Sequence, residues 1–151
     1  MQERLSQAIA QALKWLRTRD LSTHELAHRL TAKGYTDAEV AAAVEWLRAE
    51  GYLSDARLTE RLAERLTTEQ PSGRLRIVQE FARRGLDAPP LEGDEESRAV
   101  HALHLRFGEP PVAWEPRHAA QWFRFLLQRG FESEVAQSAL RRWNPRLNDE
   151  P

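Results

Sequence analysis

Apolar residues recur every three to four positions along most of the chain, which is the spacing of an amphipathic helix. The first stripe, within residues 2–18, consists of Leu5, Ala8, Ile9, Ala12, Leu13 and Leu16. Further stripes predict helices over about 23–33, 37–50, 55–68, 72–84, 95–107, 116–130 and 132–143. No segment alternates apolar and polar residues for long enough to predict a strand. The pattern therefore predicts an all-α fold.

Two polar motifs indicate where helices begin. Ser22 and Thr36 are each followed three residues later by a glutamate, Glu25 and Glu39. In such a capping box the hydroxyl accepts a hydrogen bond from a backbone N–H of the first turn, and the glutamate accepts one from the capping residue. Pro116 suits the first turn of a helix, where its missing N–H is not needed. Helices are therefore expected to start at these three points.

A pattern of apolar residues followed by glycine occurs three times. Its copies are Leu26-x3-Leu30-x3-Gly34-Tyr35, Ile77-x3-Phe81-x3-Gly85-Leu86 and Trp122-x3-Leu126-x3-Gly130-Phe131. Each glycine is predicted to end a helix in the left-handed conformation, and the next apolar residue to contact the one five positions earlier. The residues before the glycines are basic, and we interpret them as cations beside the negative end of a helix. They are Lys33, Arg84 and Arg129.

The repeats divide the chain into three helical units. We predict the first over residues 1–53, the second over 54–93, and the third, with a frayed tail, over 94–151. The stretch from Asp87 to Glu96 contains two prolines, one glycine and five acids, so it is interpreted as a linker. The third helix of the middle unit is accordingly predicted to be weak or missing. Tandem three-helix units stack on their neighbours, which predicts an elongated array.

Composition narrows the class of protein. The 151 residues include no cysteine, which excludes disulfide frameworks, thiolate metal sites and thiol catalysis. No apolar run approaches the roughly 20 residues of a membrane span. The N-terminus lacks the basic and then apolar layout of a secretory signal. We therefore expect a soluble cytoplasmic protein without a membrane partner.

Charge changes along the chain although the total is close to zero. The net charge is −1, from 22 Lys and Arg against 23 Asp and Glu, which argues against a simple nucleic-acid-binding domain. Residues 65–86, however, contain five bases and two acids, whereas residues 87–97 contain five acids and no base. Separate fields of opposite sign suit a partner that itself carries charge, including nucleic acid.

One segment matches a catalytic motif. His24-Glu25-Leu26-Ala27-His28 satisfies the zinc metalloprotease pattern H-E-x-x-H. The repeat pattern requires Leu26 in the core and the capping box uses Glu25, so we favour an exposed polar face over a metal site. His101, His104 and His118 are likewise interpreted as solvated or structural. No glycine-rich phosphate loop or nucleophile elbow is present. We therefore predict no enzyme activity, no metal and no cofactor.

The five tryptophans are interpreted as anchors of the core and of the repeat interfaces. They are Trp15, Trp46, Trp114, Trp122 and Trp143. Trp114 precedes Pro116 in a predicted loop, so an exposed contact role stays open for it.

The residues resemble one known family. The central resemblance lies in Gly51-Tyr52-Leu53-Ser54-Asp55-Ala56-Arg57-Leu58 and in Arg74-Leu75-Arg76-Ile77-Val78-Gln79-Glu80-Phe81-Ala82-Arg83-Arg84-Gly85-Leu86. Together with the segments around Gly34 and Gly130, these residues are similar to RecX proteins over about residues 8–143. The resemblance implies tandem three-helix repeats and a regulator that binds the RecA–DNA filament. It further implies inhibition of recombinase, ATPase and co-protease activity, with effects on recombination and the SOS response.

The resemblance also implies which partners to expect. They are the RecA nucleoprotein filament and, by direct contact, single- or double-stranded DNA, bound by a monomer. We expect the strongest contacts at Arg74, Arg76, Arg83 and Arg84, followed by Arg124, Arg129, Arg141 and Arg142. The family usually continues the middle repeat with a third helix, and its interruption here at Pro89-Pro90 would let the repeats hinge or change the curvature of the array. The alternative function is a helical DNA-binding module that acts independently of RecA.

Overall fold

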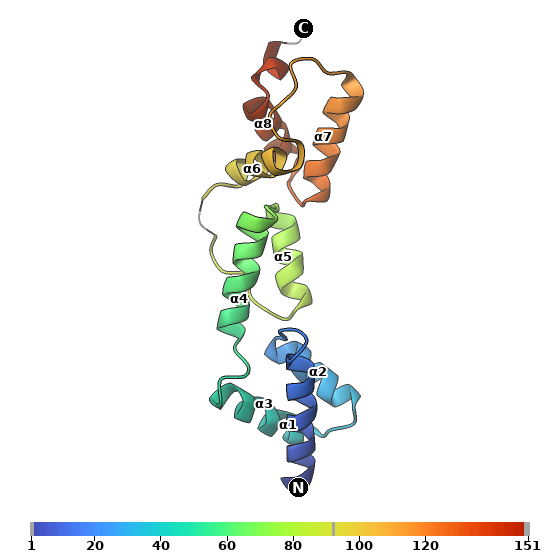
Figure 1. The fold of residues 1–151 in the computed structure, drawn as a ribbon, viewed down its shortest axis with the longest axis vertical. Coiled ribbons are helices and arrows are strands. Elements are labelled where there is room, and N and C mark those ends of the chain that lie inside the picture. The colour runs from blue at the N-terminus through green and yellow to red at the C-terminus, as the bar shows by residue number, and fades with distance from the viewer. Residues whose placement is uncertain (1, 92, 150–151) are drawn as a thin grey trace. The chain divides into compact units, whose positions relative to one another are not determined.

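The computed structural model describes residues 2–91 and 93–149. Within these residues the chain forms eight α-helices and no strand, so the all-α prediction is confirmed (Figure 1). The helices are α1 Gln2–Leu16, α2 Thr23–Ala32, α3 Asp37–Ala49, α4 Asp55–Glu64, α5 Arg74–Arg83, α6 Glu95–Phe107, α7 Pro116–Gln128 and α8 Ser133–Trp143. No helix in this described part combines the length and the apolar character that a membrane crossing requires.

The described residues form two compact units. The first holds residues 2–61 and 81–87, and the second holds residues 62–80, 88–91 and 93–149. The boundaries fall inside α4 and α5, so each of these helices contributes to both units. The division into repeats at 1–53, 54–93 and 94–151 stays a prediction.

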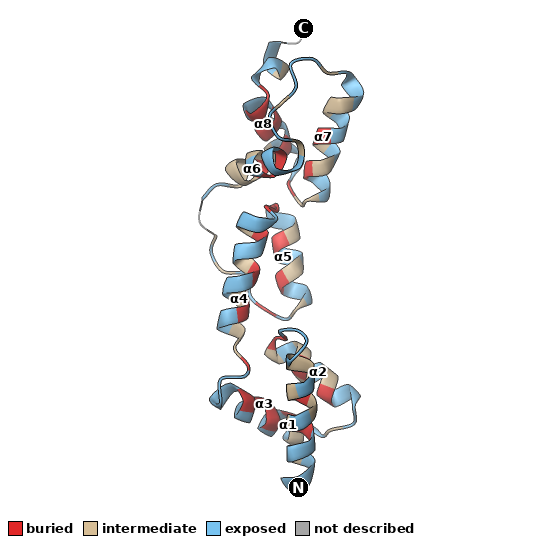
Figure 2. Ribbon diagram, viewed as in Figure 1, coloured by how far each residue is buried: buried red, intermediate tan, exposed pale blue. Residues whose placement is uncertain are grey.

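The core of the first unit lies among α1, α2 and α3. α1 packs on α3 and on α2, and α2 packs on α3. Most of the buried residues are the apolar ones of the helical stripes, joined by Leu21 and Leu53 from the segments between helices, and Figure 2 marks buried positions along these helices. The buried residues are Ala8, Ala12, Leu21, Leu26, Leu30, Val40, Ala43, Val44, Leu47 and Leu53. The 3.6-residue spacing thus brings these residues to a common interior.

The core of the second unit lies among α6, α7 and α8 and is rich in aromatic rings. The rings of Trp122 and Trp143 meet edge to face with centroids 5.0 Å apart. Phe107 and Phe125 make a similar contact at 5.3 Å. The short 3-10 helix Pro145–Asp149 packs on α8 through Leu147, within the segment predicted as the tail. Residues 150 and 151 of that predicted tail lie outside the described residues.

The predicted capping boxes are both present. The Ser22 hydroxyl accepts a hydrogen bond from the backbone N–H of Glu25, whose carboxylate accepts one from the Ser22 N–H. Thr36 and Glu39 make the same pair of bonds at the start of α3. These bonds satisfy backbone donors that the helix itself leaves without partners.

The predicted glycine turns are also present at the ends of α2, α5 and α7. Gly34, Gly85 and Gly130 have φ values of 98°, 70° and 90°, in the left-handed region. In each turn the N–H of the following apolar residue donates to the carbonyl five residues earlier, which is the Schellman arrangement. These bonds join Tyr35 to Leu30, Leu86 to Phe81 and Phe131 to Leu126. The three turns are therefore built alike.

The middle of the chain departs from regular α-helix. After α4, residues Arg65–Glu69 form a π-helical turn, and the Gln70 N–H donates to the carbonyl of Arg65, five residues back, at 2.7 Å. After α5, residues 84–91, 93 and 94 contain no helix, in agreement with the predicted loss of the third helix. Glu92, which belongs to the predicted linker, lies outside the described residues.

Candidate functional site

In the first unit, the glycine turn that ends α5 lies against the start of α2. The Ser22 hydroxyl donates a hydrogen bond to the carbonyl of Arg84. A Cβ atom on Gly85 would lie 2.4 Å from the Cβ of His24, which is closer than two carbon atoms approach. Glycine is therefore required at this position both by its left-handed backbone and by the close approach. We call this contact the first junction.

An ion pair closes the first junction. The Nε of Arg84 lies 3.2 and 3.4 Å from the two carboxylate oxygens of Glu25, and its Nη2 lies 3.1 Å from Oε1. The Nη2 also donates to the carbonyl of Asp20 at 2.8 Å. The Arg84 side chain is only 13% exposed. Its guanidinium is thus held inside the unit, with a fork-like geometry that suits a carboxylate.

Glu25 is held as an anion at this junction. Partial burial alone raises the pKa of the Glu25 carboxyl, but hydrogen bonds from the Ser22 N–H and from Arg84 outweigh it. The pKa therefore lies below its ordinary value. Glu25 has its partners within the unit, while His24 and His28 beside it are exposed. No group of three or more His, Cys, Asp or Glu side chains in residues 2–91 and 93–149 is arranged to hold a metal ion.

In the second unit, the glycine turn that ends α7 lies against the start of α5 in the same way. The Gly73 N–H donates to the carbonyl of Arg129 at 2.8 Å, and the Leu75 N–H donates to the carbonyl of Gly130 at 3.2 Å. A Cβ atom on Gly73 would lie 2.2 Å from the carbonyl carbon of Gly130. We call this contact the second junction. In both junctions, the residue before a helix bonds the carbonyl of the arginine that directly follows a later helix, through the hydroxyl of Ser22 in the first and the backbone N–H of Gly73 in the second.

The second junction differs from the first in its charges. Arg76 occupies the third position of α5, as Glu25 does in α2, and it stands beside Arg129. The Nε atoms of both arginines are buried and have no hydrogen-bond partner. Burial, followed by the positive charge of Arg76, lowers the pKa of Arg129. Two like charges therefore meet where the first junction has an ion pair.

The flanks of the linker are tied together within the second unit. The backbone N–H of Arg74 donates to a carboxylate oxygen of Glu95 at 3.0 Å. The Nε of Arg98 donates to the carbonyl of Ser72 at 3.2 Å. These bonds join the start of α5 to the start of α6, so the described segments on either side of the linker are not independent. A shallow pocket under the linker is lined by Arg74, Ile77, Val78, Ala88, Pro89, Leu91, Gly93, Glu95 and Arg98.

The other predicted contact residues lie at several places. Arg74 and Arg83 begin and end α5 and are exposed. Arg124 is exposed on α7. Arg141 and Arg142 are exposed in the last turn of α8, and Arg142 pairs with Glu96 at 3.3 Å. Of the eight predicted arginines, the structure thus places Arg76 beside Arg129 and holds Arg84 in an internal ion pair, while the contact roles of all eight stay predictions.

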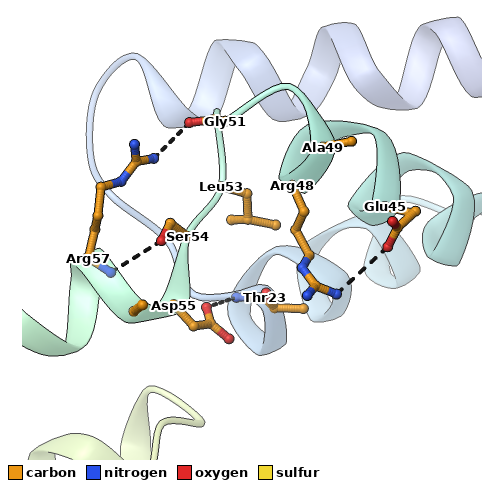
Figure 3. Close-up of a pocket in the computed structure, with 10 residues that line it drawn as sticks. Thr23, Glu45, Arg48, Ala49, Gly51, Leu53, Ser54, Asp55 and Arg57 are labelled. Carbon is orange, nitrogen blue, oxygen red and sulfur yellow. Dashed lines mark hydrogen bonds and ion pairs between the residues drawn. The ribbon is translucent and has the colours of Figure 1, made fainter.

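In the first unit, the segment that follows α3 is hydrogen-bonded to the starts of α4 and α2 (Figure 3). Ser54 accepts a hydrogen bond from the Arg57 N–H at the start of α4, and Arg57 donates through Nη2 to the carbonyl of Gly51. Asp55 accepts a hydrogen bond from the Thr23 N–H at 2.8 Å, so it caps α2 from another helix. Ser54, Asp55 and Arg57 therefore use their polar groups to hold the backbone of the first unit. They also line an open pocket.

Four of the five tryptophans follow the prediction of internal anchors. Trp122 and Trp143 are buried, and Trp15 and Trp114 pack against the two cores. Trp114 lies against Trp122 with ring centroids 6.2 Å apart, which supports the anchor role over an exposed contact. Trp46 departs from the prediction, because it is 39% exposed and stacks on Tyr52, which is 54% exposed.

Sequence reasoning missed the junctions, although a signal for them was present. The sequence predicts Arg84 and Arg129 as cations beside their own helix ends, yet their carbonyls accept bonds from Ser22 and Gly73, which directly precede other helices. In the repeat alignment, Glu25 directly precedes Leu26 and Arg76 directly precedes Ile77. Comparing these two positions would have indicated that a carboxylate in one repeat is replaced by an arginine in the next.

Comparisons with known proteins agree with this fold. A family model described as the first three-helix domain of RecX matches residues 8–47. The solved crystal structure of RecX from Lactobacillus salivarius superposes with a TM-score of 0.71 over 95% of this chain and 99% of that chain, at 15% identity. A second crystal structure, of a regulatory protein RecX, gives a TM-score of 0.62 over 90% of this chain and 72% of that one, at 16% identity. At these identities the likeness concerns the fold.

Sequence similarity to named relatives is closer. The regulatory protein RecX of Leptothrix cholodnii is 38% identical over 141 residues, which cover 86% of this chain and 85% of the relative. The protein of the same name from Acidithiobacillus ferrooxidans is 35% identical over 138 residues, or 89% of each chain. The chain therefore belongs to the RecX family of regulatory proteins.

Proposed function

We propose that this chain binds the RecA–DNA filament in the cytoplasm and inhibits its recombinase, ATPase and co-protease activities. Inhibition of this kind would modulate recombination and the SOS response. The observation that carries the proposal is the 38% identity, over 86% of the chain, to a protein named regulatory protein RecX. The activity is that of a binding protein and needs no cofactor.

Exposed arginines support binding to a charged partner. Arg74, Arg124 and Arg141 lie in the second unit with exposed side chains. Exposed guanidinium groups form bidentate bonds with phosphates and carboxylates, both of which a nucleoprotein filament presents. Several such contacts along a repeating surface add by effective concentration, so each one can be weak.

The direct test is the RecA ATPase rate on single-stranded DNA as this protein is titrated in. We expect the rate to fall, and the fall to require more of a variant in which Arg124→Glu and Arg141→Glu are combined. Arg117→Glu is the matched single-site control, because Arg117 is exposed in the same unit but pairs with Glu115 and lies outside the predicted contact set. An ATPase rate unchanged at every ratio would refute the proposal.

A second measurement separates this proposal from an independent DNA-binding module. The affinity for a single-stranded oligonucleotide is measured without RecA at two salt concentrations. We expect weak binding, in keeping with the net charge of −1. Tight binding with a steep salt dependence, combined with no effect on RecA, would favour the module.

A further inference from the structure

The two junctions join the same parts of the repeats, although Ser22 bonds through its hydroxyl and Gly73 through its backbone N–H. In each, the residue before a ten-residue helix bonds the carbonyl of the arginine that precedes a repeat glycine. The third residue of that helix then stands beside the same arginine. In the first junction this residue is Glu25, paired with Arg84, and in the second it is Arg76, whose Cβ would lie 2.4 Å from a Cβ on Gly130, the residue after Arg129. At the second junction an arginine thus occupies the position that the carboxylate of the ion pair occupies at the first.

The missing acid is not supplied from elsewhere in the described residues. Within 2–91 and 93–149, neither Arg76 nor Arg129 forms a hydrogen bond or ion pair through its guanidinium, although Arg129 also contacts the ring of Phe125. Both side chains are half-buried and both Nε atoms are shielded from water. A charge removed from water without a counter-charge raises the free energy of the folded state. One anion held between the two guanidinium groups would relieve both charges.

We propose that Arg76 and Arg129 form a receptor for one carboxylate, from an aspartate or glutamate side chain on the protein partner. This inference rests on the proposed function and deepens it, because the partner is then the protein component of the filament rather than its DNA. The carboxylate would form an ion pair with the arginines of the second junction, as Glu25 does with Arg84 at the first. It would reach the Nη groups, since the Nε atoms are covered.

Two observations favour a carboxylate over a phosphate of nucleic acid. The corresponding position at the first junction already holds a carboxylate, since Arg84 bonds Glu25 through both Nε and Nη2. The acidic end of the linker also lies beside the start of α5. Glu95 accepts a hydrogen bond from the N–H of Arg74, which is two residues before Arg76. A nucleic acid backbone would bring several negative charges close to this acidic segment, whereas a single side chain brings one.

The test converts the second junction into the first. Arg76→Glu places a carboxylate opposite Arg129, so it should pair internally and occupy the receptor. We expect the thermal midpoint of the isolated protein to rise by about 2–4 °C, and its affinity for DNA-free RecA to fall roughly tenfold or more. Arg117→Glu makes the same change in net charge away from the junction and should leave both values near those of the wild type.

A second arm identifies the anion without RecA. Thermal midpoints are compared in sodium acetate and in sodium chloride at equal ionic strength. Acetate should stabilise the wild type more than chloride does, and this difference should disappear in Arg76→Glu. Should Arg76→Glu not fold, Arg76→Gln removes the charge at similar length and should lose both the RecA affinity and the acetate effect.

The outcomes separate the possibilities. Unchanged affinity for RecA in folded Arg76→Glu would overturn the inference, and so would a loss of affinity confined to a single-stranded oligonucleotide, which would indicate a phosphate site. Failure of the wild type to bind the RecA–DNA filament, together with an acetate effect that depends on Arg76, would refute the proposed function and leave the carboxylate receptor standing. No difference between acetate and chloride in the wild type would refute the receptor itself.

Discussion

At the scale of single residues, glycine positions separate two physical demands. Gly34 needs only its backbone conformation, with φ of 98° and no atom within 4 Å of the point where a Cβ would lie. Gly85 needs the same conformation and also the absence of a side chain, because His24 lies against it. Gly73 has no unusual φ, and its lack of a side chain alone lets it meet Gly130. The same residue type therefore serves local geometry at one site and tertiary contact at another.

We predict different costs for alanine at two of these glycines. Gly34→Ala should lower the free energy of unfolding by about 1–2 kcal/mol, the cost of a left-handed non-glycine residue. Gly85→Ala carries that cost and a further ~1–3 kcal/mol for displacing the packed neighbour. Urea unfolding followed by tryptophan fluorescence measures both values. Equal losses in the two variants would show that the close approach to His24 contributes nothing.

At the scale of the helices, capping residues also serve beyond their own helix. Ser22 and Thr36 close the same capping box, but Ser22 is fully buried and its hydroxyl also donates to the carbonyl of Arg84. Asp55 also acts outside its own helix, because it begins α4 while its carboxylate accepts a hydrogen bond from the N–H of Thr23 at the start of α2. Helix starts in the first unit are therefore points where separate helices are joined.

Removing the two capping hydroxyls should reveal this difference. Thr36→Ala should cost about 1 kcal/mol of unfolding free energy, the usual effect of losing an N-cap. Ser22→Ala should cost about 1 kcal/mol more, because the carbonyl of Arg84 also loses its donor in a buried position. Chemical denaturation of the two variants provides the comparison. A cost for Ser22→Ala no greater than that for Thr36→Ala would contradict a role at the junction.

At the scale of the whole molecule, the chain has two cores and helices that contribute to both units. Its net charge near neutral pH is −1, so general repulsion is small and specific carboxylates govern the response to acid. Hydrogen bonds from Arg4 and Thr36 lower the pKa of Glu39 to about 2. The pKa of Asp94 is also lowered, by the backbone and side chain of Ser97. Carboxylates with lowered pKa values thus occur in both units.

Stability should consequently fall in acid. A carboxyl whose pKa is about 2 in the folded chain and 4.5 in the unfolded chain stabilises the fold fully above pH 4.5, and this contribution is lost as the pH falls toward 2. Glu39→Gln should be less stable than the wild type at pH 7, and its stability should depend less on pH between 4.5 and 2. Urea midpoints at pH 7, 4 and 2.5 test this. Parallel pH profiles for the two proteins would show that Glu39 is not the group responsible.

Much of the secondary structure and both capping boxes could be predicted from the sequence. Each depends on residues at most five positions apart, such as Glu25 bonding Ser22 or the Tyr35 N–H bonding the Leu30 carbonyl. Interactions over that range follow from helix geometry, so the order of the residues alone determines them. The helix stripes and the glycine turns could therefore be predicted from short segments of sequence alone.

The sequence by itself thus determined the helices, their ends and the family, whereas only the tertiary structure decided which helix end meets which helix start. Arg84 meets Glu25 across 59 residues, and Arg129 stands beside Arg76 from another helix. From sequence these arginines look alike, because each precedes a glycine at the end of a helix. Their environments differ because packing places a carboxylate opposite one and a guanidinium opposite the other. Charge at a packed surface depends on the neighbour that the fold supplies, and that neighbour is set by the joint burial of many apolar side chains rather than by local spacing.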